Sequence, residues 1–298
     1  MNKSLKARSG GARADLHIHT CASDSRWTPH DVVVGCLDEG IDLLAIADHD
    51  TSDSVVTAEA LALDAGLSFL RAIEVSSTAE DILVHILAYG VDIEDSALQT
   101  LLADNRAHDE AKRQADVQRL NSLGYPVSLE GYIAHPDDRT RGGFKLLNYI
   151  IDPGIVANIH DYAQTISPQL EKPWGDFAHP ADAIEVIRGA GGIPVMAHPG
   201  GSLRAQGGVT DMNMTRMLNY GLAGFECFSR YHDINTMGAC LQFCYKRDLI
   251  ITGGSDFHGH LLGRKLGSPQ VRTDQLRLHE IVDRIRHPAY MPELTPAD

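Results

Sequence analysis

The chain has 298 residues and a formal net charge of −14 at pH 7. This length allows one large α/β domain, or a barrel with an insertion, and is too great for a bare β-sandwich. The acidic balance argues against long nucleic acid as a partner, because phosphate backbones are attracted by basic surfaces, although a local pocket could still bind a small anion.

The N-terminal residues 1–15 are basic and lack the apolar segment of a secretory signal, so they are expected to form a disordered leader. The chain contains no run of eighteen apolar residues, and we expect no association with a membrane. Its five cysteines form no Cys-x-x-Cys pair, which indicates reduced, mostly buried thiols. These features together predict a cytoplasmic protein.

Short apolar runs rich in Ile, Val and Leu are the predicted strands, and each is short enough for a buried parallel strand. In chain order they are RADLHIHT, DLLAIADHD, LSFLRAIEVS, DILVHILAYG, GGIPVMAHPG, LAGFECFS and LIITGGSDFH. Between most of them lie amphipathic helices, such as residues 29–40, 53–66 and 180–191, which begin with Pro or an Asp or Ser cap and end with Gly. The alternation predicts βα units and a parallel sheet or barrel.

Residues 91–179 break this alternation. The segment is polar and of helical character, with a long charged stretch, DNRAHDEAKRQADVQRLNSLG, and no clear strand. Strand spacing on both sides of it remains regular. We therefore predict that an inserted helical subdomain interrupts the α/β unit.

Histidines and carboxylates gather at the ends of the predicted strands. In a β/α barrel these ends converge on one face, which is the active face. The residues there are His17, His19, Asp24, Asp48, His49, Glu74, His85, His198, Asp256 and His258. Alternate residues of a strand point the same way, so His17 and His19 can share one ion. Each buried polar atom of this kind that had no partner would cost roughly 1–3 kcal/mol of folding free energy. The gathering of these residues therefore predicts a metal site.

The segments DLHIHTCASD, AIADHDT, AIEVS, VHILAYG, VMAHPG and GSDFHG, in this order, resemble the successive motifs of the PHP (polymerase and histidinol phosphatase) family of metal-dependent phosphoesterases. The resemblance implies an α/β fold, a distorted seven-stranded (β/α) barrel of residues 13–90 and 180–290, with residues 91–179 as an inserted helical subdomain that covers the substrate. It also implies that His17, His19, Glu74 and Asp256 hold a first ion, Glu74, His85 and His198 a second, and Asp24, His49 and His258 a third.

Such a site would bind two to three divalent ions, and its histidine and carboxylate ligands suit Mn, Fe and Zn alike. A hydroxide bridging two ions could then attack a phosphate ester near neutral pH. Among family members the chain is most similar to stand-alone phosphoesterases with a helical insertion, some of which act on nucleotides or nucleoside 3′,5′-bisphosphates. The expected activity is hydrolysis of a small phosphomonoester of this kind. The alternatives are a 5′–3′ exonuclease on short oligonucleotides, a histidinol-phosphate-type phosphatase and, least favoured by the complete ligand set, a non-catalytic metal-binding module.

The insert sequence RTRGGFK supplies candidate substrate contacts, because Arg141 and Lys145 flank two glycines whose N–H groups could also face a phosphate. His232 follows the sixth predicted strand and matches a histidine position that the resemblance places near the substrate. It is expected to bind phosphate or to protonate the leaving oxygen. Together with the bridging carboxylate of Glu74, His232 is the predicted catalytic side chain.

Overall fold

The computed structural model describes residues 11–79, 82–170, 172 and 174–289. Its strands are β1 (Arg13–Ile18), β2 (Leu43–Ile46), β3 (Ser68–Phe69), β4 (Ala72–Ala79), β5 (Ile82–Tyr89), β6 (Ile193–Met196), β7 (Gly224–Ser229), β8 (Ile250–Gly254) and β9 (Val271–Arg272). Of the leader predicted for residues 1–15, residues 1–10 lie outside the described residues, and the expectation was wrong for residues 13–15, which are part of strand β1.

The α-helices are α1 (Pro29–Asp38), α2 (Val55–Asp64), α3 (Ser96–Ser122), α4 (Leu129–Ala134), α5 (Lys145–Ile151), α6 (Ile159–Asp161), α7 (Pro180–Gly189), α8 (Pro199–Ser202), α9 (Asp211–Leu218) and α10 (Ile234–Arg247). Shorter helical turns are η2 (Arg139–Arg141), η3 (Tyr162–Ile166), η4 (Ser167–Gln169), η5 (Arg204–Gln206), η6 (Leu261–Gly263) and η7 (His279–Arg284). None of the helices in the described ranges is both long and apolar enough to cross a membrane.

Each predicted strand and each of the three predicted helices quoted by range has a counterpart in the structure. The third apolar run is divided into β3 and β4, and the short strand β9 was not predicted. Helix α1 begins where the sequence indicates, because Pro29 occupies its first turn and Thr28 and Asp31 form a reciprocal capping box. Likewise His179 caps α7 by accepting a hydrogen bond from the Ala181 N–H.

The strands form two mixed sheets, in the orders β3-β2-β1-β9 and β4-β5-β6-β7-β8. The expectation of purely parallel pairing was wrong, since β4–β5, β5–β6 and β1–β9 are antiparallel. Only residues 80 and 81 separate β4 from β5 in the sequence, whereas a parallel crossover needs a dozen or more residues. Strand β5 therefore runs against its neighbours, and β6 pairs with it antiparallel.

A single closed seven-stranded barrel is not found among the described strands. Instead, the two sheets meet along a seam at which isolated parallel bridges join Ile18 to Phe257 and His49 to Glu74. The His19 N–H also donates to the Phe257 carbonyl at 3.0 Å. The ends of β1, β2 and β8 and the start of β4 are thereby brought to one place between the sheets.

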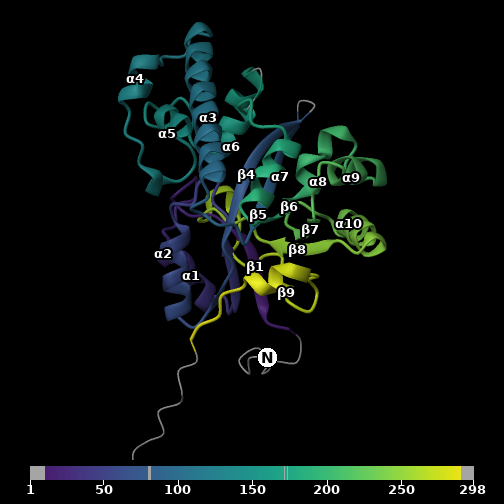
Figure 1. Ribbon diagram of the computed structural model, residues 1–298. Coiled ribbons are helices and arrows are strands. Elements are labelled where there is room, and N and C mark those ends of the chain that lie inside the picture. The colour runs from purple at the N-terminus through teal and green to yellow at the C-terminus, as the bar shows by residue number, and fades with distance from the viewer. Residues whose placement is uncertain (1–10, 80–81, 171, 173, 290–298) are drawn as a thin grey trace, which may run out of the picture.

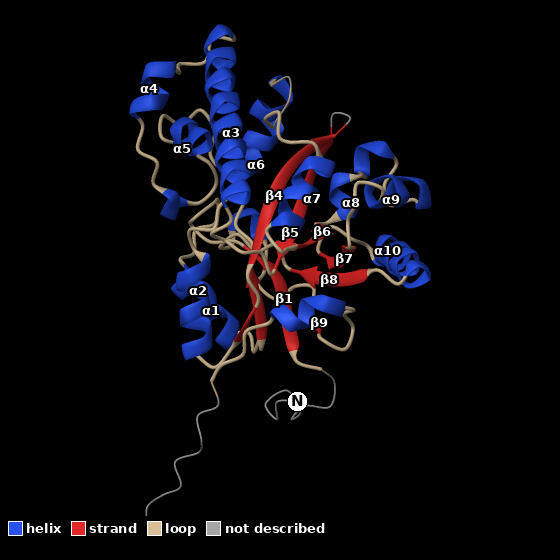
Figure 2. Cartoon of the chain, viewed as in Figure 1, coloured by secondary structure: helices blue, strands red, loops and turns tan. Residues whose placement is uncertain are grey.

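Helices surround the strands, as Figure 2 shows. Helices α1 and α2 flank one side, α8, α9 and α10 lie on the other, and α3 with α4 and α5 extends beyond the end of the sheets (Figure 1). A large apolar core fills the space between helices and sheets, and a smaller one lies among the strands.

The described part of 91–179 contains helices and no strand. It has an apolar core of its own, which includes Leu120, Tyr132 and Leu146. Helix α3 is fixed to the sheets by Asn105, whose amide donates to the Asp50 carboxylate at 2.7 Å and to the Ser76 carbonyl at 2.8 Å. The helical character of the segment agrees with the sequence analysis, while its bounds as a separate domain stay a prediction.

Candidate metal centre

Strand β1 carries the first two histidines of the site into the seam between the sheets. His17 and His19 are both fully buried. The β1 backbone around them is held by Asp15, whose carboxylate accepts hydrogen bonds from the Ser255 N–H at 2.9 Å and the Gly267 N–H at 2.9 Å. This buried carboxylate ties β1 to the chain that leaves β8, and so places the histidines beside Asp256.

Four buried side chains bring their ligand atoms together: His17, His19, Glu74 and Asp256. His17 Nε2 lies 3.0 Å from Glu74 Oε2 and 3.1 Å from His19 Nε2, and His19 Nε2 lies 3.1 Å from Asp256 Oδ1. Ligands about 2.0–2.2 Å from one ion lie about 3 Å apart when they meet at a right angle. The spacing therefore suits four ligands of one ion.

Glu74 faces several imidazoles with its two oxygens. Oε1 lies 3.2 Å from His85 Nδ1 and 3.0 Å from His198 Nε2, while Oε2 lies 3.3 Å from His49 Nδ1. His85 reaches it from the middle of β5, opposite Ser76, rather than from a strand end. The ligand atoms of His49, Glu74 and His85 form the second group, so Glu74 belongs to two groups. His198, which was predicted in this group, lies 3.0 Å from Glu74 Oε1 but is in none of the three.

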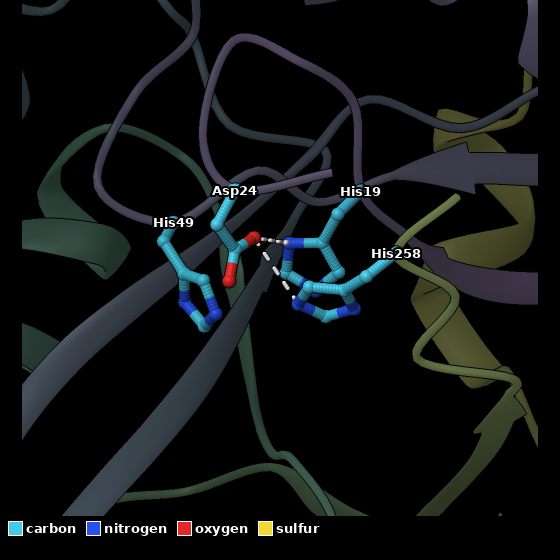
Figure 3. A group of neighbouring side chains, drawn as sticks. All are labelled: His19, Asp24, His49 and His258. Atoms are coloured by element: carbon cyan, nitrogen blue, oxygen red, sulfur yellow. Dashed lines mark ion pairs between the residues drawn. The ribbon is translucent and has the colours of Figure 1, made fainter. Parts of the chain in front are cut away.

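A third group consists of Asp24, His49 and His258, with His19 beside them (Figure 3). Asp24 Oδ1 lies 3.1 Å from His258 Nε2 and 3.8 Å from His19 Nδ1. His258 Nδ1 lies 2.9 Å from the Asp256 carbonyl and 2.6 Å from the Arg264 guanidinium, and its Nε2 is the nitrogen that faces Asp24. Asp24 is the most exposed member, with 31% of its side chain accessible.

Several buried polar atoms of the cluster have no hydrogen-bond partner in the described structure, namely His19 Nδ1, His49 Nδ1, Glu74 Oε2 and His85 Nδ1. Leaving such atoms unsatisfied costs roughly 1–3 kcal/mol each. Divalent ions would bind lone pairs of this kind, and nitrogen with carboxylate oxygen is a donor set that Mn, Fe and Zn accept. The residues present therefore fit a multinuclear metal site.

The charges of the cluster stabilise one another. Burial raises the pKa of the Glu74 carboxyl, but the imidazoles of His17, His49 and His85 outweigh it and bring the pKa well below its usual range. Asp256 shows the same balance, with Arg264 as its strongest positive neighbour. For His17, burial lowers the pKa and the carboxylates of Glu74, Glu226 and Asp256 raise it well above its usual value. Without metal, the surrounding carboxylates therefore favour the protonated form of His17.

Other residues position the ligands, and sequence reasoning missed most of them. Tyr231 donates its hydroxyl hydrogen to Asp256 at 2.9 Å, and Arg264 donates to the same carboxylate at 2.6 Å. Asp48 accepts from the Thr20 N–H at 2.7 Å and the Ser23 hydroxyl at 2.6 Å, so it fixes the loop that ends in Asp24 and belongs to none of the ligand groups. The sequence offers no spacing signal for Tyr231 or Arg264.

A cavity of about 510 Å³ lies beside the cluster and is lined in part by Asp24, His49 and His85. Its other walls come mainly from the helical segment and include cationic side chains, Arg106, Arg113, Arg139 and Lys145, and aromatic ones, Tyr132, Phe144, Trp174 and Phe177. The candidate metal centre therefore opens into a cavity that is lined largely by the helical segment 91–179.

The two insert residues predicted to contact substrate are placed differently. Lys145 lines the cavity beside the cluster, with its ammonium 4.9 Å from the centre of the Tyr132 ring. Arg141 instead lines a separate cavity of about 570 Å³ and forms a bidentate pair with the Asp152 carboxylate. Hence only Lys145 is brought to the metal side.

His232 lies behind the loop that carries His198. Its Nδ1 donates to the Cys227 carbonyl at 2.8 Å, and its Nε2 accepts from the Gly200 N–H at 2.9 Å. Burial lowers its pKa. Both ring nitrogens are thus occupied by backbone groups, and the role of His232 as a proton donor or phosphate ligand stays a prediction.

Comparison with known proteins identifies several relatives, although no protein-family model matches the chain. A phosphoribosyl 1,2-cyclic phosphate 1,2-diphosphodiesterase of Eggerthella lenta is 28% identical over 255 residues, which cover 82% of this chain and 94% of that protein. A 5′-3′ exoribonuclease of Haemophilus influenzae is 30% identical over 191 residues, covering 62% and 68% respectively. A 3′,5′-nucleoside bisphosphate phosphatase of Chromobacterium violaceum is 28% identical over 258 residues, covering 83% and 87%.

Among solved structures, a protein of Bifidobacterium adolescentis assigned as a metal-dependent phosphoesterase superposes with a TM-score of 0.80. The two chains are 28% identical, and the match covers 93% of this chain and 98% of the other. The similarity therefore extends over both sheets and the helical segment.

Proposed function

The chain belongs to the PHP-type metal-dependent phosphoesterases, and on this basis we propose that it hydrolyses a phosphomonoester of a small nucleotide, with nucleoside 3′,5′-bisphosphates as the preferred class. Two or three divalent ions of Mn, Fe or Zn would be held by the three groups of ligand atoms. Bound there, such ions lower the pKa of water and neutralise phosphate oxygens. The buried imidazoles and carboxylates keep the ions in place, and the cavity of about 510 Å³ holds the substrate.

The observation that carries the proposed substrate is the composition of this cavity. Among the residues that the structure describes, Arg106 and Lys145 form no ion pair with a carboxylate; they donate instead to the backbone carbonyls of Asp50 and Ile133. Both cations are therefore available to a second phosphate. Trp174 presents a buried indole N–H with no partner in the described structure, and with Phe177 it offers an aromatic surface for a base. One phosphate at the ions, a base and a second phosphate together describe a bisphosphate.

Cleavage of short oligonucleotides is the second candidate, and the second cavity favours it. That cavity, with Arg26, His160 and His260 in its lining, shares Asn148 with the cavity beside the cluster. The nucleotides that follow a 5′-terminal one could lie there. The net charge of −14 opposes long chains, so we keep this candidate for short ones.

A panel of substrates with added Mn²⁺ tests the proposal: nucleoside monophosphates, 3′,5′-bisphosphates, histidinol phosphate and short oligonucleotides. We expect the highest kcat/KM with a 3′,5′-bisphosphate, because only this ligand uses the ions, the aromatic surface and the cations together. Faster release of mononucleotides from oligonucleotides would favour the second candidate. Preference for histidinol phosphate, or no turnover with any of them, would contradict the proposal.

Lys145→Ala is expected to lower kcat/KM for the bisphosphate about ten- to hundred-fold, because a lost charge-assisted hydrogen bond costs roughly 1.5–3 kcal/mol. The loss should be smaller with p-nitrophenyl phosphate, whose good leaving group depends less on remote contacts. Steady-state kinetics on both substrates measures the difference.

Arg141→Ala is the matched control for Lys145→Ala. It removes a cation of the same loop that faces the other cavity, so the bisphosphate reaction should change little. Equal losses in both variants would show that the two cavities have been assigned wrongly, and a loss confined to oligonucleotides in Arg141→Ala would support the second candidate.

A further inference from the structure

Glu226, the third residue of β7, is fully buried behind the metal centre and belongs to none of the three ligand groups. Both of its oxygens are occupied. Oε1 lies 3.1 Å from His17 Nδ1, and Oε2 accepts the backbone N–H of His198 at 2.8 Å. One carboxylate thus contacts His17 on β1 and the backbone of His198, a predicted ligand that follows β6.

The contact with His17 determines which ring nitrogen carries the hydrogen. A carboxylate can only accept a hydrogen bond here, so His17 Nδ1 must be the donor. The neutral imidazole then has its lone pair on Nε2, the nitrogen that lies 3.0 Å from Glu74 and 3.4 Å from Asp256. Metal-binding histidines are commonly oriented in this way by a carboxylate on their second nitrogen.

The contact with His198 fixes a strained piece of backbone. His198 has φ 29° and ψ 57°, a left-handed conformation that is uncommon for a residue with a side chain. Its N–H points to Glu226, and its Nε2 lies 3.0 Å from Glu74 Oε1. Glu226 itself is held by the pairing of β7 with β8, in which it lies opposite Thr252.

We propose that Glu226 is a positioning residue of the metal centre, which holds His17 in its Nδ1–H tautomer and at the same time fixes the backbone of His198. The inference rests on the metal dependence of the proposed function and not on the choice of substrate. It assigns a task to a buried carboxylate that lies outside the three ligand groups.

Glu226→Gln tests the tautomer without changing the shape of the side chain. An amide offers one acceptor and one donor, so its oxygen can satisfy either the His17 Nδ1–H or the His198 N–H, and its NH₂ faces the other. The arrangement free of donor–donor contact has the amide donating to His17 Nδ1, which moves the ring hydrogen to Nε2 and blocks metal binding there. We therefore expect about 10–100-fold weaker affinity for the ion held by His17.

The affinity is measured by titrating metal-free protein with Zn²⁺ in competition with a chromophoric chelator. Asp116→Asn is the matched control, since Asp116 is also a buried acid but lies on α3 and pairs with Lys112. Wild type and this control should bind alike. A folded Glu226→Gln variant with wild-type affinity would overturn the inference, whereas a wild type that binds no Zn²⁺ would contradict the metal dependence itself.

The tautomer can also be read directly in the wild-type enzyme, which decides the matter if Glu226→Gln does not fold. In Zn²⁺-loaded protein, nitrogen-15 spectra of the histidine rings, assigned with a His17 variant, should show hydrogen on His17 Nδ1 and none on Nε2. Hydrogen on Nε2 would refute the role of Glu226.

Discussion

Glu74→Gln is expected to lose bound metal and phosphatase activity together. The substitution keeps the shape of the side chain and removes a negative charge that faces five imidazoles at 3.0–3.3 Å. Removing one partner of a buried charge pair costs roughly 3–5 kcal/mol, which corresponds to about two to four orders of magnitude in affinity. The metal content per chain, measured by elemental analysis, and kcat should therefore fall in parallel.

Glu59→Gln is a suitable control for this variant, because Glu59 lies on α2, pairs with Arg71 and belongs to none of the three ligand groups. It should keep the metal content and turnover of the wild type. Wild-type turnover in Glu74→Gln would show that the carboxylate is not shared between ions.

The second large effect concerns pH. Carboxylate neighbours raise the pKa values of His17 and His19 despite burial, which by itself lowers them. Since only a neutral imidazole binds a metal ion, each of these protons must leave on binding. The apparent affinity for Zn²⁺ should rise with pH, roughly tenfold per pH unit for each displaced proton, until the raised pKa values are passed. Chelator competition at a series of pH values measures the slope, and an affinity independent of pH between about 6 and 8 would contradict this charge balance.

The same groups set how the stability of the metal-free protein depends on pH. Glu74 and Asp256 have depressed pKa values. Their contribution to the free energy of unfolding is therefore present above the ordinary carboxyl pKa and is lost as pH falls through the depressed values. His17 and His19 have raised pKa values. Their contribution to the free energy of unfolding is therefore complete below the ordinary histidine pKa and is lost as pH rises through the raised pKa values. The cluster should therefore stabilise the metal-free fold most between about pH 4.5 and about pH 6.5. Denaturant unfolding after chelation measures this.

The side chains that meet in the candidate metal centre could be brought together from sequence because they follow local rules, while their role as ligands stays a prediction. His17 and His19 are two positions apart at the end of β1, Asp24 lies in the loop that follows β1, and Asp256 and His258 follow β8. The directions of the strands were harder to predict. Strands β4 and β5 are antiparallel because the connection between them is too short for a crossover helix. Glu226 is recognisable in the sequence as a charged residue inside an apolar run. Its partner His17 was not predictable, because it is 209 positions away in the chain.

Which cavity an insert residue lines was harder to predict, and Arg141 and Lys145 show why. They are four positions apart, and the sequence predicted that both contact one phosphate. Between them Gly142 and Gly143 take φ values of 71° and 70°, which residues with side chains rarely adopt, and the chain turns so that the two cations face different cavities. A turn of this kind is visible only once the backbone conformation is known.

Metal content tests the central claim most directly. Protein purified without chelator should carry two or three transition-metal ions per chain by elemental analysis, in line with its three groups of ligand atoms, and phosphatase activity should be lost on chelation and return with Mn²⁺, Fe²⁺ or Zn²⁺. A folded protein that contains no metal and cannot be reconstituted with any of these ions would contradict the claim that it is a metal-dependent phosphoesterase.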